Sequence, residues 1–121
     1  MWWRILVGFS VALLVGEASA KEVAAMGAGT STCAQFAIRY RASPELVESE
    51  YYTWAQGFMS ARNVQKLTEN RSSQNLDSIP TGVQKMRLRT YCDNHPLAEY
   101  LDAIMDLYDS FSPNAPVTPH R

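Results

Sequence analysis

The chain has 121 residues and a formal net charge of −1, from 11 Lys and Arg against 12 Asp and Glu. This balance argues against a nucleic-acid-binding protein, because such proteins usually carry a basic excess. The chain also lacks paired catalytic carboxylates, a glycine-rich phosphate loop, a nucleophile elbow and a metal-binding helix motif. We therefore expect no enzymatic activity and no cofactor or metal.

The first residues of the chain, 1–20, have the three parts of a secretory signal peptide. Arg4 supplies the basic region, residues 5–15 form an apolar run, and Ala18-Ser19-Ala20 is a small-residue cleavage site. An uncleaved membrane anchor is the alternative, but a spanning helix needs roughly 20 apolar residues. We expect cleavage after Ala20 and a mature protein in the periplasm without membrane attachment.

Two further segments have compositions typical of irregular chain. Residues 21–31 are small and contain glycine, which predicts a flexible lead-in. Residues 112–121 carry a proline at every third position, which predicts a disordered tail, although this spacing also resembles a polyproline ligand. The folded part is then one helical domain over residues 32–111, a size that leaves little stability to spare.

The mature chain contains two cysteines, Cys33 and Cys92. In an oxidising compartment such a pair forms a disulfide by default. Closing a loop of about 60 residues stabilises the fold by roughly 4 kcal/mol, because the unfolded chain loses entropy. We therefore predict that Cys33 and Cys92 form a structural disulfide.

The residues that follow Cys92 leave two other interpretations open, because Asp93 and His95 are close by in the sequence. A zinc site needs three or four ligands, and the rest of the mature chain offers few, mainly Cys33 and His120. A nucleophile pair of Cys92 and His95 needs a free thiol, which an exported cysteine with a partner rarely keeps. Both interpretations are weaker than the structural disulfide.

Apolar residues recur at helical spacing along the body and no useful strand-like alternation occurs, so we predict an all-α bundle of about four helices. The first helix, over residues 32–41, has one apolar stripe. The second, over residues 43–66, begins at Ser43-Pro44-Glu45, where a serine cap, a proline and an acidic residue suit a helix start. The expected inward residues are Cys33, Phe36, Ala37 and Tyr40 in the first helix, and Val47, Tyr51, Trp54, Phe58 and Ala61 in the second.

Residues 68–78 are polar and rich in Ser and Asn, which predicts a loop. A third helix is expected over residues 80–92 and a fourth over residues 96–111, with Asn94 closing one and Pro96 in the first turn of the next. The expected inward residues are Val83, Met86 and Thr90 in the third helix, and Leu97, Leu101, Ile104, Tyr108 and Phe111 in the fourth.

Gly57 lies within the second predicted helix, where glycine costs about 1 kcal/mol relative to alanine. With Ser60 and Ala61 it forms a small-residue patch beside Trp54 and Phe58. We expect this patch to allow close approach of another helix, such as one that carries a cysteine. A ligand-binding notch beside Trp54 is the alternative.

Two short charge clusters and many aromatic residues bear on binding. We interpret the charge clusters as solvated faces, with partner binding as the alternative. Some of the aromatic residues must reach the surface, which favours a protein-binding role. The clusters are Glu45, Glu48 and Glu50 in the second predicted helix, and Lys85, Arg87 and Arg89 in the third.

A family resemblance rests on the signal peptide, on the early Cys33, and on two short runs of sequence. These runs are Trp54-Ala55-Gln56-Gly57-Phe58-Met59-Ser60 and Tyr91-Cys92-Asp93-Asn94-His95-Pro96-Leu97. The pattern resembles small, single-disulfide helical periplasmic proteins of the HdeA-like type, and is similar to type VI secretion immunity proteins of the Rap/Tai kind. In HdeA-like proteins the matching cysteines are bonded, which implies the same for Cys33 and Cys92.

The resemblance implies two different functions. An HdeA-like stress protein would be a chaperone that protects unfolded clients when acid loosens its own fold. An immunity or inhibitor protein would bind one specific secreted partner through its folded surface at neutral pH. A homodimer is compatible with either function. A third option, a hydrolase that uses Cys92 and His95, requires a free thiol.

Overall fold

The computed structural model describes residues 24–116, which form an all-α protein. Within this range there is no strand, and one disulfide joins Cys33 to Cys92, so the predicted fold class is confirmed. The predicted signal peptide lies outside the described residues, as do the ends of the predicted lead-in and tail. The elements are η1 (Ala28–Thr30), α1 (Cys33–Ala42), α2 (Pro44–Thr68), α3 (Thr81–Asn94) and α4 (Tyr100–Asp109).

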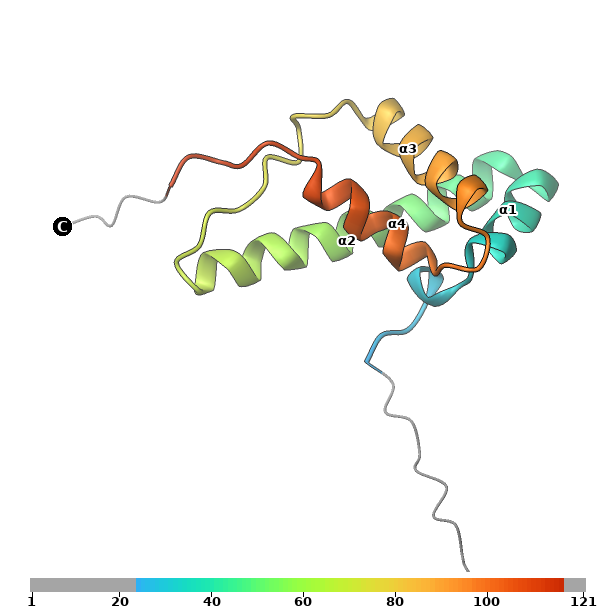
Figure 1. Cartoon of the computed structure of the whole chain (residues 1–121), viewed down its shortest axis with the longest axis horizontal. Coiled ribbons are helices and arrows are strands. Elements are labelled where there is room, and N and C mark those ends of the chain that lie inside the picture. Colours follow the sequence, from blue (N-terminus) through green and yellow to red (C-terminus); the bar gives the residue numbers. More distant parts are fainter. Residues whose placement is uncertain (1–23, 117–121) are drawn as a thin grey trace, which may run out of the picture.

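The long α2 is the base of the bundle, and α3 and α4 pack against each other beside it (Figure 1). The helix α1 packs on both α2 and α3 at the end where α2 begins. The loop after α2 lies at the opposite end, together with the first residues of the tail (Figure 1). This arrangement gives the bundle one end with a disulfide and one end without.

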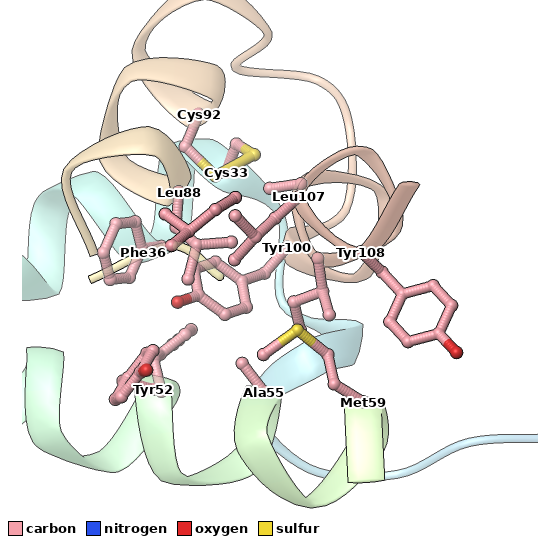
Figure 2. Packing of buried hydrophobic residues seen from close by; sticks show 14 of the residues in the cluster. Cys33, Phe36, Tyr52, Ala55, Met59, Leu88, Cys92, Tyr100, Leu107 and Tyr108 are labelled. Atoms are coloured by element: carbon pink, nitrogen blue, oxygen red, sulfur yellow. A yellow bond between two sulfur atoms is a disulfide. The ribbon is translucent and has the colours of Figure 1, made fainter. Parts of the chain in front are cut away.

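One hydrophobic core runs through the bundle, and the disulfide lies at its edge (Figure 2). Its centre is aromatic and consists of Phe36, Tyr51 and Tyr100. In each of the three pairs, the two ring centroids are 4.9 Å apart. Such tilted and edge-to-face pairs add stabilisation beyond the burial of their area. The largest fully buried side chains are Tyr51, Tyr100, Tyr108, Met59, Leu88, Ile104 and Leu107.

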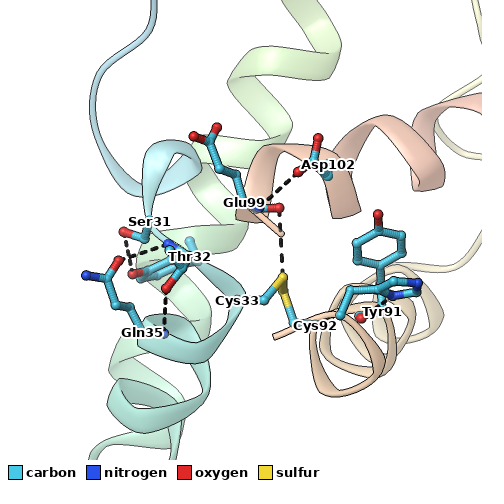
Figure 3. The surroundings of a disulfide bond; sticks show 10 residues. Ser31, Thr32, Cys33, Gln35, Tyr91, Cys92, Glu99 and Asp102 are labelled. Carbon is cyan, nitrogen blue, oxygen red and sulfur yellow. Dashed lines mark hydrogen bonds between the residues drawn. A yellow bond between two sulfur atoms is a disulfide. The ribbon is translucent and has the colours of Figure 1, made fainter. Parts of the chain in front are cut away.

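The start of α1 is capped from within the helix and from the segment before α4 (Figure 3). Thr32 and Gln35 form a reciprocal capping box, with Gln35 N–H donating to Thr32 Oγ1 at 3.1 Å and Thr32 N–H donating to Gln35 Oε1 at 2.9 Å. The N–H groups of Cys33 and Ala34 donate to the carbonyls of Ala98 and Pro96. These bonds place Cys33 against residues 96–98, which follow Cys92 in the sequence.

The same bonds explain why α4 begins at Tyr100 and not at the predicted Pro96. The segment before Tyr100 is occupied with capping α1, and Glu99 then caps α4 in a box with Asp102 (Figure 3). The prediction that Leu97 faces inward is wrong, because its side chain is 93% exposed. Ile104, Tyr108 and Phe111 are buried as predicted.

The buried face of α2 differs from the predicted stripe. Val47 and Tyr51 are buried as expected, but Trp54 and Phe58 are only partly buried and Ala61 is exposed. The core side of the later turns consists instead of Tyr52, Ala55 and Met59. Tyr52 turns inward because its hydroxyl finds a buried acceptor, Gln84 Oε1, at 2.8 Å.

The start of α2 also differs in detail. Ser43 is the residue before the helix, with Pro44 in the first turn as predicted. The predicted serine cap is wrong, however, because the Ser43 side chain makes no capping hydrogen bond. Ser43 also ends α1, where its backbone N–H donates to the carbonyl of Arg39. The two helices therefore share one residue between them.

The buried face of α3 differs from the predicted one, although Val83 is partly buried and packs against the core as predicted. Met86 is 50% exposed and Thr90 is exposed, whereas the buried residues are Gln84, Leu88 and Cys92. These three residues are spaced four apart and so share one face of the helix. The disulfide turns Cys92 toward α1, and this sets the phase of the whole helix.

The predicted flexible lead-in and disordered tail are partly ordered. Residues 28–30 form η1, which packs on α2 and α4, and Gly29 is buried. In the tail, Asn75 N–H donates to Ser112 O at 2.7 Å and Asn114 N–H donates to Ser73 O at 2.8 Å. Backbone pairing of this kind satisfies polar groups that would otherwise be unpaired. These residues of the lead-in and the tail are therefore held in place, although residues 112–114 belong to no regular element.

Candidate functional site

The residues around Cys92, which the sequence left open as a nucleophile or zinc site, form a disulfide-linked connection between helices. The disulfide joins the first residue of α1 to the last turn of α3, and both Cys33 and Cys92 are buried (Figure 3). His95 stacks on Tyr91, with ring centroids 4.2 Å apart, and its Nδ1 lies 2.8 Å from the Tyr91 carbonyl oxygen. Because the Cys92 thiol is bonded, a Cys92–His95 nucleophile pair is excluded.

The second predicted site, around Gly57, is not brought together by the fold. Gly57, Ser60 and Ala61 are exposed, and a Cβ placed on Gly57 would have no neighbour within 4 Å beyond its own turn of helix. The prediction that another helix approaches closely at Gly57 is therefore wrong. Trp54 and Phe58 lie beside this patch and stack on each other, with ring centroids 5.7 Å apart.

Trp54 contacts glycines that the sequence did not single out. The N-terminal segment crosses its indole ring, and Trp54 Nε1 donates to the carbonyl of Met26 at 3.1 Å. A Cβ at Gly29 would lie 2.2 Å from two indole carbons, which is too close for any side chain. The close backbone approach therefore occurs at Gly27 and Gly29, in the segment that was expected to be a flexible lead-in.

Two hollows lie on either side of α3. One, of about 570 Å³, lies between α3 and α4, and the other, of about 360 Å³, lies between α3 and α1. Met86 and Thr90 line both hollows and form the ridge between them. We call the ridge and its two hollows the α3 surface. Its other lining residues are Arg87, Tyr91, Asn94, His95, Asp106 and Ser110 in the first hollow, and Phe36, Ala37, Tyr40, Arg41, Arg89 and Asp93 in the second.

Each hollow of the α3 surface carries charges of both signs. Arg87 donates to Ser110 Oγ at 3.0 Å, and Arg89 pairs with Glu48 of α2 and lies 5.5 Å above the Tyr40 ring centroid. The ion pairs formed among the described residues are Arg39–Glu50, Arg71–Glu69 and Arg89–Glu48. Arg41 and Arg87 are in none of these pairs, nor are Asp93 and Asp106, so both signs of charge remain available to a partner.

Sequence reasoning missed the α3 surface because it placed Met86 in the core. The signal was present, since a predicted disulfide at Cys92 requires Leu88 and Gln84 to share the inward face. Met86 then falls on the outside. The charges of Arg87 and Arg89 were noted as a cluster, but only the fold shows that Arg87 lines a hollow and Arg89 reaches α2.

The buried polar contacts are made by neutral groups. Among the described residues, the buried polar side chains are Ser73 and Gln84, and no carboxylate is buried. Besides the bond to Gln84, Tyr108 donates to Asn63 Oδ1 at 2.7 Å and Tyr51 donates to Ser31 Oγ at 3.0 Å. Hydrogen bonds between tyrosine, amide and hydroxyl groups do not change between neutral pH and acid.

Two side chains show a clear shift in pKa that bears on stability. The pKa of the exposed Glu69 carboxyl is lowered, first by the hydrogen bond from Arg71 and then by that from Gln65. A lowered carboxyl pKa contributes stability near neutral pH that is lost as the pH falls. Burial raises the pKa of Tyr100, and the nearby Glu48 carboxylate raises it further.

Within residues 24–116, no three or more His, Cys, Asp and Glu side chains are grouped so that they could hold a metal ion. In the same range, none of the helices has the length and apolar character needed to cross a bilayer. Comparison with known proteins finds no match, since no family model, no curated protein and no solved structure matches the chain.

Proposed function

We propose that this protein is an exported, non-enzymatic binding protein that holds one protein partner while it is folded. It would act as an inhibitor or immunity protein in the periplasm, like the Rap/Tai proteins that its sequence resembles. The α3 surface is the observation that carries this proposal. It combines two hollows with a ridge on which a large apolar side chain, Met86, is half exposed.

The residue types of the α3 surface support protein recognition. Methionine, tyrosine and arginine are enriched in protein interfaces compared with the rest of the surface. The α3 surface has Met86 at its centre, Tyr40 and Tyr91 in the hollows, and Arg41 and Arg87 on its two sides. A partner that suits it places an apolar side chain over Met86 and offers charged groups to the two arginines.

The polar interior supports a protein that works in its folded form. The bond Tyr52–Gln84 joins α2 to α3, and the bond Tyr108–Asn63 joins α2 to α4, neither with a carboxylate. Acid therefore removes little of the buried hydrogen bonding. A binding surface that stays folded from neutral pH into acid favours an inhibitor, because an acid-activated chaperone must open.

The proposal is tested by charge substitution on the ridge. The oxidised mature protein, Met86→Asp and Leu97→Asp are each immobilised at pH 7 and exposed to the exported proteins of the source organism. Leu97→Asp is the matched control, because Leu97 is an apolar side chain that is 93% exposed and lines neither hollow. Circular dichroism checks that both variants keep their helices.

The expected result is one protein in defined stoichiometry that is retained by the unaltered protein and by Leu97→Asp. The same protein is lost, or bound at least tenfold more weakly, with Met86→Asp. Retention by all three proteins would place the binding surface elsewhere and contradict the role of the α3 surface. No specific retention by any of them would contradict the inhibitor function.

A second candidate, an acid-activated chaperone of the HdeA-like type, is favoured by a different observation. Two ion pairs join α2 to the other helices, Arg39–Glu50 to α1 and Arg89–Glu48 to α3. Ion pairs of this kind require a charged carboxylate, and strong acid removes that charge. The disulfide would still hold α1 to α3. In acid, α2 would then separate and expose the apolar face that it buries at neutral pH.

An aggregation assay separates the two candidates. A generic client is heated or diluted from denaturant at pH 7 and at about pH 2.5, where carboxylates are largely protonated. Near-ultraviolet circular dichroism of the protein alone follows its tertiary packing at the same pH values. Protection of the client only in acid, together with loss of tertiary packing, would support the chaperone. Retained packing without protection would leave the inhibitor as the function.

A further inference from the structure

Residues 26–30, which we call the strap, lie directly on the indole ring of Trp54. The ring nitrogen donates to the carbonyl of Met26 at 3.1 Å. A Cβ at Gly27 would lie 2.8 Å from the indole nitrogen, and one at Gly29 would lie 2.2 Å from two ring carbons. Gly27 also has a φ of +94°, which side chains disfavour. Only a Gly-x-Gly backbone therefore fits against this ring.

The strap is held by few contacts of its own side chains. Thr30 closes it into a turn, through bonds from its N–H and its Oγ1 to the carbonyl of Gly27 at 3.0 and 2.8 Å. Ala28 packs against the core, but Met26 is 79% exposed. Segments with few buried apolar contacts open locally at a lower free energy than the whole fold. The strap also packs on α2 and α4, with Gly29 buried, so we expect its opening to cost more than fraying of a free end and less than unfolding of the helices.

The surface beneath the strap has the features of a binding site for backbone. Trp54 stacks on Phe58 with an angle of 10° between the rings, so that the indole presents one flat side to the strap. Its Nε1–H, at a partly exposed position, donates to the carbonyl of Met26 in the strap. An occupant that matches the strap therefore offers a carbonyl and a backbone without side chains at two positions.

We propose that the strap is exchangeable, and that the Trp54 site binds a Gly-x-Gly segment of a partner protein in its place. The strap itself shows which chemistry fits, since it is such a segment seated on the site. This site is separate from the α3 surface, because η1 packs on α2 and α4 (Figure 1). A tethered segment has an effective concentration on the order of millimolar. A partner segment must therefore be brought close by another contact, such as docking on the α3 surface.

The first test uses the full mature chain and its fluorescence. Trp54 is the only tryptophan after the expected cleavage site, so it reports the strap alone. Gly29→Ala places a methyl group where the ring lies and is expected to displace the strap. Acrylamide should then quench Trp54 several-fold more efficiently, with unchanged helical circular dichroism. Gly57→Ala, which has free space on the same helix, is the control and should match the unaltered protein.

A peptide with the sequence of residues 26–31, Met-Gly-Ala-Gly-Thr-Ser, is then added to Gly29→Ala. The expected result is saturable protection of Trp54 back to the level of the unaltered protein. A peptide with alanine in place of its second glycine should bind at least tenfold more weakly. Equal effects of the two peptides, or no effect of the glycine peptide, would overturn the proposal.

The unaltered protein gives a second measurement in case Gly29→Ala does not fold. The amides of Thr30 and Ser31 donate to Gly27 and Ala28 within the strap, and their hydrogen exchange reports its opening. Millimolar glycine peptide should accelerate exchange at these two amides several-fold, without changing exchange in α2. Unchanged exchange would overturn the proposal. Opening that depends on protein concentration without peptide would show that the occupant is a second copy, which also overturns it.

Discussion

The two ends of the bundle are held together by different kinds of bond. At the disulfide end, Cys33 is bonded to Cys92 and the rings of Phe36, Tyr51 and Tyr100 pack behind them. At the far end, residues 72–75 of the loop pair with residues 112–114 of the tail, an arrangement that we call the clasp. The clasp contains amides and hydroxyls where the other end has sulfur and aromatic rings.

The clasp is organised by two amide side chains. Asn63 of α2 accepts from Gln74 N–H and donates to Gln74 O, at 2.9 and 2.8 Å. Gln74 in turn donates to the carbonyls of Tyr108 and Phe111 at the end of α4. Two short chain segments without large apolar residues are thus ordered because their polar groups find partners. We therefore expect the clasp to open locally while the disulfide end stays closed.

The largest expected loss of stability comes from removing the disulfide. Replacing both cysteines by serine should lower the free energy of unfolding by about 4 kcal/mol, because the closed loop spans 59 residues. Urea denaturation of the variant and of the reduced unaltered protein measures the loss. The two should agree, since both lack the same cross-link. A loss below about 1 kcal/mol would mean that both ends depend mainly on packing.

The next largest expected loss of stability comes from removing a side chain that organises the clasp. Asn63→Ala leaves the Tyr108 hydroxyl and the Gln74 backbone N–H without their hydrogen-bond partner, and should cost about 2 kcal/mol. Hydrogen exchange at the amides of Asn75 and Asn114 should rise more than exchange in α1. Asn75→Ala, on the exposed side of the clasp, is the control and should cost less than about 1 kcal/mol. Equal acceleration at both ends would show that the bundle opens as one unit.

Alkaline pH tests the aromatic centre of the disulfide end. Burial raises the pKa of Tyr100, so the folded state keeps its proton while the unfolded state loses it above about pH 10. Stability is then complete below pH 10 and is lost as the pH rises through this range, by about 1.4 kcal/mol at pH 11. Tyr100→Phe should remove this pH dependence, with little change at pH 7. An unchanged alkaline slope in the variant would assign the loss to other groups.

The smallest effect is a gain in stability on the exposed side of α2. Gly57→Ala should raise the free energy of unfolding by about 0.5–1 kcal/mol, because alanine favours the helix and its methyl group meets no neighbour. Thermal denaturation measures the gain, with Gly82→Ala, another helical glycine with free space around it, as a comparison. A loss at Gly57 would point to a contact with another molecule at this position.

Much of the fold could be predicted from the sequence because its signals are local. The helix starts near Cys33 and Pro44, and the pairing of Cys33 with Cys92, follow from spacing, proline and compartment alone. The face that each helix buries was predicted less well. In α3 the stripe of Gln84, Leu88 and Cys92 contains one polar and one half-cystine residue, so apolar periodicity favoured Met86. A buried glutamine needs partners that only other elements supply, here Tyr52 and the carbonyls of Leu76 and Ile79.

The candidate sites likewise combine features that the sequence shows with features that only the fold creates. The residues of the α3 surface come from α1, α3 and α4, so no local pattern could bring them together. The glycine that stood out in the sequence, Gly57, meets nothing, while Gly27 and Gly29 lie against Trp54 from far along the chain. A glycine's local conformational cost is visible in a sequence, but the neighbour that requires it is not.

For residues 24–116, the sequence by itself determined the all-α fold, the number of α-helices and the disulfide, because helical periodicity, caps and cysteine chemistry act over a few residues or through a single pair. The tertiary structure decided which side of each helix is covered. It also decided that the strap covers Trp54, that the clasp orders the tail, and that Met86 lies outside. These outcomes depend on hydrogen bonds and contacts between distant segments, and such partners form only when the whole chain has folded.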